Sequence, residues 1–265
     1  MDALTVYVDG IGIWALHIAD WPALARALEC GEIVRSDTTQ RPSPSALPPT
    51  ERRRAPEPVL LACEAAGQAS AMAGRDPRAL ACVFTSTHGD LAITDAMCAT
   101  LAADPRELSP TRFHNSVHNA PSGYWTVAAH CHASATAISA AHGSFAAGLL
   151  EAAIEVHADG EPVLLSAYDI AAHGPLAEVA PSTASFAAAF VLSPLRGAAT
   201  LARLSLQTVQ ESAMPPAIPP ALTPLAGNPM AAQALPLLAA IGRREPATVL
   251  IGSGANTSLR VEVTP

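Results

Sequence analysis

The residues best able to do chemistry lie at a sharp polar turn, Ala140-Ala141-His142-Gly143-Ser144, between an apolar segment and an Ala-rich segment. A strand, a sharp turn and a buried helix in that order form a nucleophile elbow, which in enzymes presents Cys or Ser at its tip. Here the tip carries His142, Gly143 and Ser144. The side chain at that tip therefore decides which reactions are open to the protein.

Two reactive groups stand at this turn, and each has a structural alternative. His142 at a helix N-terminus stays neutral near pH 7, because the helix dipole disfavours an imidazolium there, and a neutral imidazole is a general base. Ser144 is a possible hydrolase nucleophile, but residues two apart rarely align hydroxyl and imidazole, and no GxSxG motif is present. We favour the structural interpretation, in which His142 is a polar cap and Ser144 an N-cap.

Other polar groups surround the turn. His114 and His118 have the spacing of the zinc-binding HExxH pair, and His130 and His132 follow, but the Glu of that motif is missing. We therefore predict no metal site and no cofactor, and expect the segment to satisfy buried backbone groups at a subunit interface. Glu151, in the apolar segment 145–157, needs a partner if it is buried; a dimer seam and an exposed helix edge both remain open.

Strands alternating with helices must position these groups, which predicts an α/β protein. Apolar and β-branched runs predict strands over 4–8, 80–86, 135–141, 162–167, 184–193, 201–207, 247–251 and 259–263. Helical patterns cover 21–29, 59–73, 93–103, 145–157 and 230–241, and the helix over 145–157 is expected to be buried on all sides. Loops are predicted over 36–58, 113–125 and 215–229. Gly10 and Gly12 predict a tight turn and a close backbone approach after the first strand.

Composition excludes several classes of protein. The 265 residues are 50% hydrophobic and 14% charged, with a net charge of −8, which excludes a disordered chain and a membrane span. No basic residue except His lies between Arg112 and Arg196, which excludes a nucleic-acid binder, and the triplet 52–54 is expected in a solvated loop. The start has no basic signal region, and the five Cys are scattered, so we expect reduced thiols and a cytoplasmic protein.

Several motifs together resemble the β-ketoacyl synthases of the thiolase fold. The segment ISAAHGS at 138–144 stands where a synthase carries VSTACAS, Gly10-Ile11-Gly12 is similar to the first-strand TGIG turn, and 251–258 resembles the closing GFGGTNAS. The blocks at 113–120 and 145–152 look like the short chain-length factors of aryl-polyene and xanthomonadin-type clusters. The resemblance implies a thiolase-like (ketosynthase-like) layered α/β fold. Residues 1–195 would form the N-terminal half, and 196–265 a shortened C-terminal half of the same domain.

The resemblance also shows what this chain lacks. It places His142 at the position of the nucleophilic Cys, and no His follows His173 to supply the catalytic pair. Condensation needs a thiolate and two His, so the resemblance implies a non-catalytic subunit. We expect a chain-length factor that pairs with an active ketosynthase in fatty-acid or polyketide (aryl-polyene-type) biosynthesis and meets acyl carrier protein indirectly. The alternatives are a stand-alone acyltransferase or thioesterase using Ser144 and His142, and a homodimeric acyl-binding protein.

The resemblance finally suggests which side chains face a partner or an acyl tunnel. His142 and Phe145 are expected to block this chain's own tunnel, and Leu149 to lie near the dimer seam. Phe113 is the first candidate for a wall that closes the partner's tunnel, with core anchoring of its loop as the alternative. The full set of partner or tunnel candidates is Phe113, His114, His118, Asn119, Tyr124, Trp125, Phe145 and Leu149.

Overall fold

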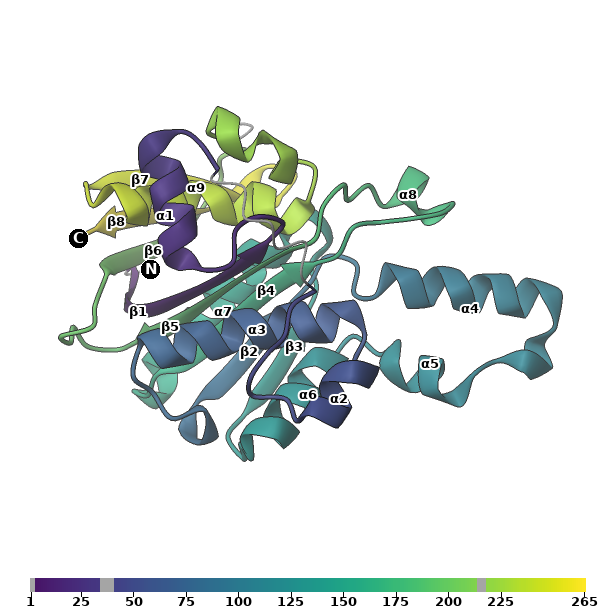
Figure 1. Ribbon diagram of the computed structural model, residues 1–265. Helices are drawn as coiled ribbons and strands as arrows, with labels where there is room; N and C mark the ends of the chain where they lie inside the picture. Colours follow the sequence, from purple (N-terminus) through teal and green to yellow (C-terminus); the bar gives the residue numbers. More distant parts are fainter. Residues whose placement is uncertain (1–2, 34–40, 214–217) are drawn as a thin grey trace.

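In the part of the chain that the computed structural model describes, residues 3–33, 41–213 and 218–265, eight strands form one mixed sheet (Figure 1). Their order is β3-β2-β4-β5-β1-β6-β8-β7. β2 pairs in parallel with β3 and β4, and the other neighbours are antiparallel. The strands are β1 Leu4–Ala15, β2 Ala81–Thr85, β3 Ala135–Ile138, β4 Val163–Asp169, β5 Phe186–Ser193, β6 Ala202–Val209, β7 Ala247–Gly254 and β8 Thr257–Thr264.

Helices pack on both faces of this sheet, which confirms the predicted α/β class. The α-helices are α1 Trp21–Cys30, α2 Pro49–Arg54, α3 Glu57–Met72, α4 Leu91–Ala103, α5 Pro110–Asn115, α6 Ala120–Ala129, α7 Ser144–Asp159, α8 Leu176–Val179 and α9 Pro229–Arg243. Helices α3 and α6 form one apolar core with the sheet, and α1, α7 and α9 form a second core on the opposite face. None of the described helices is long and apolar enough to cross a membrane.

The sheet curls around α7. Strands β3 and β7 stand at opposite ends of the strand order. In a flat sheet seven strand spacings would separate them by roughly 33 Å. Helix α7 nevertheless contacts both strands, so the sheet must bend to enclose it. The helix is therefore held between two parts of one sheet, and it begins directly after the polar turn.

Close packing of α3 on β1 explains the two early glycines. A Cβ at Gly10 would overlap the backbone of Ala69, and a Cβ at Gly12 would overlap that of Ala65. The predicted close approach is thus confirmed, but the predicted tight turn is wrong. β1 continues through both glycines with only a shift of register after Val8, because β5 and β6 supply hydrogen-bond partners along its length.

Helices also occur where loops were predicted. The range 36–58 contains α2, and 113–125 contains the end of α5 and the first half of α6; positions 36–40 lie outside the described residues. Each of these helices has Pro in its first turn. Proline is tolerated there, because that N–H has no partner within the helix. Because these prolines mark helix starts, the prediction of loops at these positions is wrong.

Helix α4 extends away from the rest of the molecule and returns through η2 (Pro105–Glu107) to α5 (Figure 1). Its main contacts are with η2 and α5, and its only buried residue is Leu91. The helix carries a single charged residue, Asp95, while Leu101 is 48% exposed. We call residues 91–115 the arm. An apolar helix without a packing surface of its own indicates a surface that another molecule covers.

Candidate functional site

The polar turn is held in shape by hydrogen bonds within it. It consists of the short helix η3 (Ala141–Gly143) between β3 and α7. The buried hydroxyl of Ser144 donates to the Ala141 carbonyl at 2.7 Å and accepts from the Ala140 N–H at 3.0 Å. Ser144 is the first residue of α7, whose N-cap is Gly143, so the prediction of a Ser144 N-cap is wrong. Its hydroxyl instead ties the turn together.

The position of Gly143 leaves no room for a side chain. A Cβ there would lie 2.7 Å from the carbonyl oxygen of Ser253 in β7. Ala141 has a positive φ of 47°, which costs a residue with a side chain of the order of 1–2 kcal/mol. The His142 side chain is exposed. It therefore does not fill a tunnel inside this chain, and the expected block of such a tunnel by His142 is wrong.

Three of the predicted tunnel residues lie in the hydrophobic cores. Trp125, Phe145 and Leu149 are each 0% exposed. The ring of Phe145 packs against Phe190 with 6.0 Å between centroids. Leu149 therefore faces the core of this chain and not a dimer seam, whereas the block of a tunnel by Phe145 stays a prediction. Both side chains lie on the inner side of α7, toward the sheet that curls around it.

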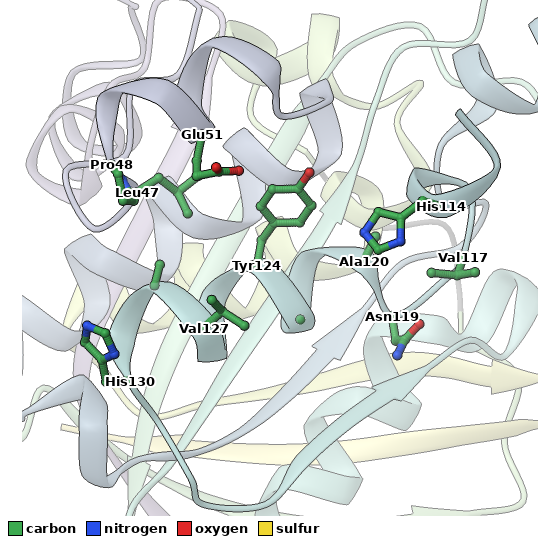
Figure 2. Close-up of a pocket in the computed structure, with 12 residues that line it drawn as sticks. Leu47, Pro48, Glu51, His114, Val117, Asn119, Ala120, Tyr124, Val127 and His130 are labelled. Atoms are coloured by element: carbon green, nitrogen blue, oxygen red, sulfur yellow. The ribbon is translucent and has the colours of Figure 1, made fainter. Parts of the chain in front are cut away.

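An apolar cavity of about 570 Å³ lies between α2 and α6 (Figure 2). Its lining residues are Leu47, Pro48, Glu51, His114, Val117, Asn119, Ala120, Gly123, Tyr124, Val127, Ala128 and His130. Of the predicted candidates, His114, Asn119 and Tyr124 thus meet here. Sites for small molecules usually measure about 300–1,000 Å³, so the cavity is large enough for part of an acyl chain.

One face of α6 forms the floor of this cavity. Ala120, Gly123, Tyr124 and Val127 follow the i, i+3, i+4, i+7 spacing of a single helix face. Val127 is 75% exposed, and a Cβ on Gly123 would meet nothing within 4 Å. Sequence reasoning missed Gly123, because it treated the first half of this helix as a loop, and Val127, because its side chain carries no polar or reactive group. The helical spacing was the signal that could have found them.

The side chain of Tyr124 lies in the cavity and is held by a hydrogen bond. Its hydroxyl donates to Oδ1 of Asn115 at 3.2 Å. Burial raises the pKa of Tyr124, the nearby Glu51 raises it further, and the hydrogen bond to Asn115 opposes both. The phenol therefore stays protonated at neutral pH. Figure 2 shows its ring in the middle of the cavity, between Glu51 and Val127.

His118 belongs to a separate polar cluster at the carboxyl ends of β2 and β4. Its Nε2 lies 3.3 Å from the Ser86 carbonyl, and since a carbonyl only accepts, Nε2 carries the proton. Asp169 Oδ1 accepts from the Ser86 hydroxyl at 2.7 Å and from the Thr87 N–H at 3.0 Å. Burial raises the pKa of Asp169 above its ordinary value, and these hydrogen bonds oppose the rise.

Phe113 and His118 lie apart from the cavity. Phe113 stands on the arm and is 58% exposed, so it anchors no core within this chain. His114 and His130 face the cavity, whereas His118 faces Ser86. Among the described residues no three His, Cys, Asp or Glu side chains are grouped so that they could hold a metal ion.

The chain matches the family model described as beta-ketoacyl synthase, N-terminal domain, over residues 26–236. No curated protein matches it. Among solved structures, it resembles a chain of the ketosynthase (ApeO) in complex with its chain length factor (ApeC) from Xenorhabdus doucetiae. The TM-score is 0.73 at 24% identity, and the match covers 98% of this chain and 99% of that chain.

Two further solved structures show the same similarity. A chain of the ishigamide ketosynthase/chain length factor has a TM-score of 0.74 at 14% identity, covering 99% of this chain and 100% of that chain. A chain of AntDE:AntF, a type II PKS acyl-carrier protein in complex with its ketosynthase, has a TM-score of 0.72 at 14% identity. The match covers 100% of this chain and 99% of that chain. These matches confirm the expected thiolase-like layered α/β fold. Together with the family model, which spans most of the sequence, they place the chain in the β-ketoacyl synthase N-terminal domain family.

Proposed function

We propose that this protein is a non-catalytic ketosynthase-like subunit, a chain-length factor, that pairs with an active ketosynthase in fatty-acid or polyketide (aryl-polyene-type) biosynthesis. The observation that carries the proposal is the turn itself. His142 occupies the position that the family resemblance assigns to the nucleophilic Cys, Gly143 has no room for a side chain, and the Ser144 hydroxyl is engaged in the turn. The turn therefore carries no thiol, and its one hydroxyl is engaged in hydrogen bonds within the turn.

None of the five cysteines replaces the missing nucleophile. Cys63, Cys82 and Cys131 are buried, and Cys30 and Cys98 are exposed on α1 and α4. Burial raises the pKa of Cys82 to about 12, and the Cys131 thiol donates to the Leu80 carbonyl at 3.2 Å. Protonated thiols are poor nucleophiles. The stand-alone acyltransferase and thioesterase alternatives therefore have no supporting observation here.

Exposed apolar side chains support the proposal that a partner subunit covers part of this chain. Leu101 and Phe113 on the arm are 48% and 58% exposed, and Val117 and Val127 at the cavity are 46% and 75% exposed. Side chains of this kind, gathered in a patch, mark protein interfaces. Two of the similar structures are ketosynthase–chain length factor complexes, and a third contains an acyl-carrier protein with its ketosynthase. A ketosynthase subunit is the partner that fits this surface, and carrier protein meets this chain indirectly, through that subunit.

The cavity over α6 receives the distal end of the acyl chain that the partner builds. Its apolar floor limits chain length because each added methylene must find room, and overpacking costs about 1–3 kcal/mol. Phe113 lies outside this cavity and stays a candidate for the wall of the partner's own tunnel. Residues 1–195 and 196–265 form one domain in this proposal, which is supported by β6, β8 and β7 extending the sheet that contains β1.

The proposal is tested by producing the chain together with a ketosynthase of the same organism that carries the nucleophilic Cys. We expect the two to co-purify, and the isolated chain to take up no labelled acyl group from acylated carrier protein when examined by intact mass. Stoichiometric acylation within 142–144 would contradict the non-catalytic role. Failure to bind any Cys-containing ketosynthase would favour the homodimeric acyl-binding alternative.

A further inference from the structure

A second, much smaller cavity lies where the two ends of the arm join the body of the molecule. Asp90, directly before α4, and Asn115, the last residue of α5, both line it, and so does Tyr168 of β4. About 10 Å³ of the cavity is open to the centre of a water molecule, which is close to the least space that one water needs. The cavity therefore has room for a single small molecule.

Tyr168 brings a buried hydroxyl to this cavity. Its side chain is 0% exposed, and among the described residues its Oη has no hydrogen-bond partner. Burial raises the pKa of Tyr168, and the charges of Asp169, Cys63 and Asp90 raise it further, so the hydroxyl keeps its proton. Burying a hydroxyl without a partner is costly, and buried polar groups in folded proteins are bonded to protein or to ordered water. The hydroxyl therefore calls for a partner in the cavity that it lines.

The two ends of the arm supply the remaining polar groups. Asp90 is 9% exposed, and its Oδ1 accepts from the Ile93 N–H at 2.8 Å as the N-cap of α4. Asn115 is 7% exposed, and its Oδ1 accepts from the Tyr124 hydroxyl at 3.2 Å. A carboxylate accepts several hydrogen bonds, and the amide nitrogen of Asn donates two. An acceptor and a donor thus stand at the same cavity as the Tyr168 hydroxyl.

We propose that this cavity binds one water molecule, which joins Tyr168 to Asp90 and Asn115. The water accepts from the Tyr168 hydroxyl and from the Asn115 amide nitrogen, and it donates to the Asp90 carboxylate. Three hydrogen bonds are typical of a buried water. A metal ion fits less well, because Asp90 is the only carboxylate among the described residues that line the cavity.

The consequence of this water is that both ends of the arm are tied to one strand of the sheet. Tyr168 belongs to β4, whereas Asp90 precedes the arm and Asn115 ends it (Figure 1). The arm has few other contacts with the body, so this link fixes the direction in which the arm leaves it. That direction sets the position of the exposed side chains of Leu101 and Phe113. The inference does not depend on which partner covers them.

The test begins with Tyr168→Phe, which removes only the hydroxyl. If a water is bound, the variant loses a hydrogen bond and leaves the water one partner short. The folding equilibrium constant, measured by urea unfolding, should then fall about threefold or more. If the hydroxyl has no partner, its removal relieves the cost of burial and the constant should rise, so the sign of the change decides. The matched control is Tyr7→Phe, a half-buried tyrosine of β1 outside the cavity, which should leave the constant unchanged.

Hydrogen exchange tests the link to the arm. Since the Tyr168 hydroxyl has no direct hydrogen bond to the arm, only a bridging molecule transmits its loss there. In Tyr168→Phe we expect exchange over residues 91–115 to become about threefold faster or more relative to α9, and in Tyr7→Phe we expect no change. Unchanged exchange over 91–115 would overturn the link, and an unchanged or raised folding constant would overturn the water.

A crystal structure of the wild-type protein gives an answer that needs no variant to fold. At a resolution that shows ordered waters, we expect one density peak at about 2.7–3.0 Å from Tyr168 Oη and from a carboxylate oxygen of Asp90. An empty cavity, or a direct hydrogen bond between these two side chains, would overturn the inference.

Discussion

Substitutions of Gly123 should change both the stability of the fold and the length of the product, for different physical reasons. It lies inside α6 with an exposed backbone, and a Cβ there would meet nothing within 4 Å. Gly in a helix interior is less favourable than Ala by about 0.8–1.0 kcal/mol. Gly123→Ala should therefore stabilise the fold by about that amount, which corresponds to a rise of about 2–4 °C in Tm for a chain of this size.

The same position faces the cavity, so a larger side chain there should also change the product. Gly123→Leu places four carbon atoms on the apolar floor next to Tyr124 and Val127. We expect the complex with the ketosynthase to release shorter chains, because the last methylenes lose their space. Product length is read by mass spectrometry from the reconstituted complex, and complex formation by gel filtration of the same sample.

Gly67 is the matched control. It lies inside α3, away from the cavity, and a Cβ there also meets nothing within 4 Å. Gly67→Ala should give the same gain in Tm, and Gly67→Leu should leave product length unchanged. If Gly123→Leu forms the complex normally and the product keeps its length, the cavity does not receive the acyl chain and the reasoning is refuted.

Three further predictions concern stability, each measured by urea unfolding. Gly12→Ala should destabilise by about 3 kcal/mol or more, because the new Cβ overlaps the backbone of Ala65 and not a movable side chain; a loss below about 1 kcal/mol would contradict the close packing of α3 on β1. Ala141→Gly should stabilise by up to about 1 kcal/mol through relief of the positive φ at the turn, and destabilisation would be inconsistent with that strain. Asp169 has a raised folded-state pKa, so the folded protein binds this proton more tightly than the unfolded chain. The stability that this proton contributes is fully present below about pH 3.9, the ordinary pKa of aspartate, and is lost as the pH rises through the raised pKa. Wild type should therefore gain stability relative to Asp169→Asn as the pH is lowered from neutral toward the ordinary aspartate pKa, and a constant difference would exclude this titration.

The helices and strands could be predicted from the sequence because they depend on patterns of neighbouring residues. The run of apolar residues at 184–193 became β5, and the Ala-rich segment at 145–157 became α7, each within about two residues of its observed ends. The outward side of α7 escaped prediction, since Ile154 is 44% exposed and Glu155 is half-buried. Composition could not reveal that one side of this helix borders an edge strand, because that depends on where β3 falls in the sheet.

The cavity was predicted only in part, for a different physical reason. His114, Asn119 and Tyr124 attracted attention as polar or aromatic residues, whereas Gly123 and Val127 carry no chemical group that marks a site. Leu47, just before α2, and Glu51, in α2, are far from α6 in the sequence and lie in a proline-rich segment. A cavity formed between two helices depends on their packing, and single-chain periodicity does not report that packing.

The turn keeps the geometry of an elbow although the position of the nucleophile carries His142. Strain at Ala141 persists only where the surroundings determine the backbone, and here the Ser144 hydrogen bonds and the contact of Gly143 with Ser253 do so. These contacts fix β3 relative to the first turn of α7. That is also the arrangement that sets Glu155 beside Thr136 at the open edge. The elbow therefore serves as a structural link between β3 and α7, a role that requires its shape but no reactive group.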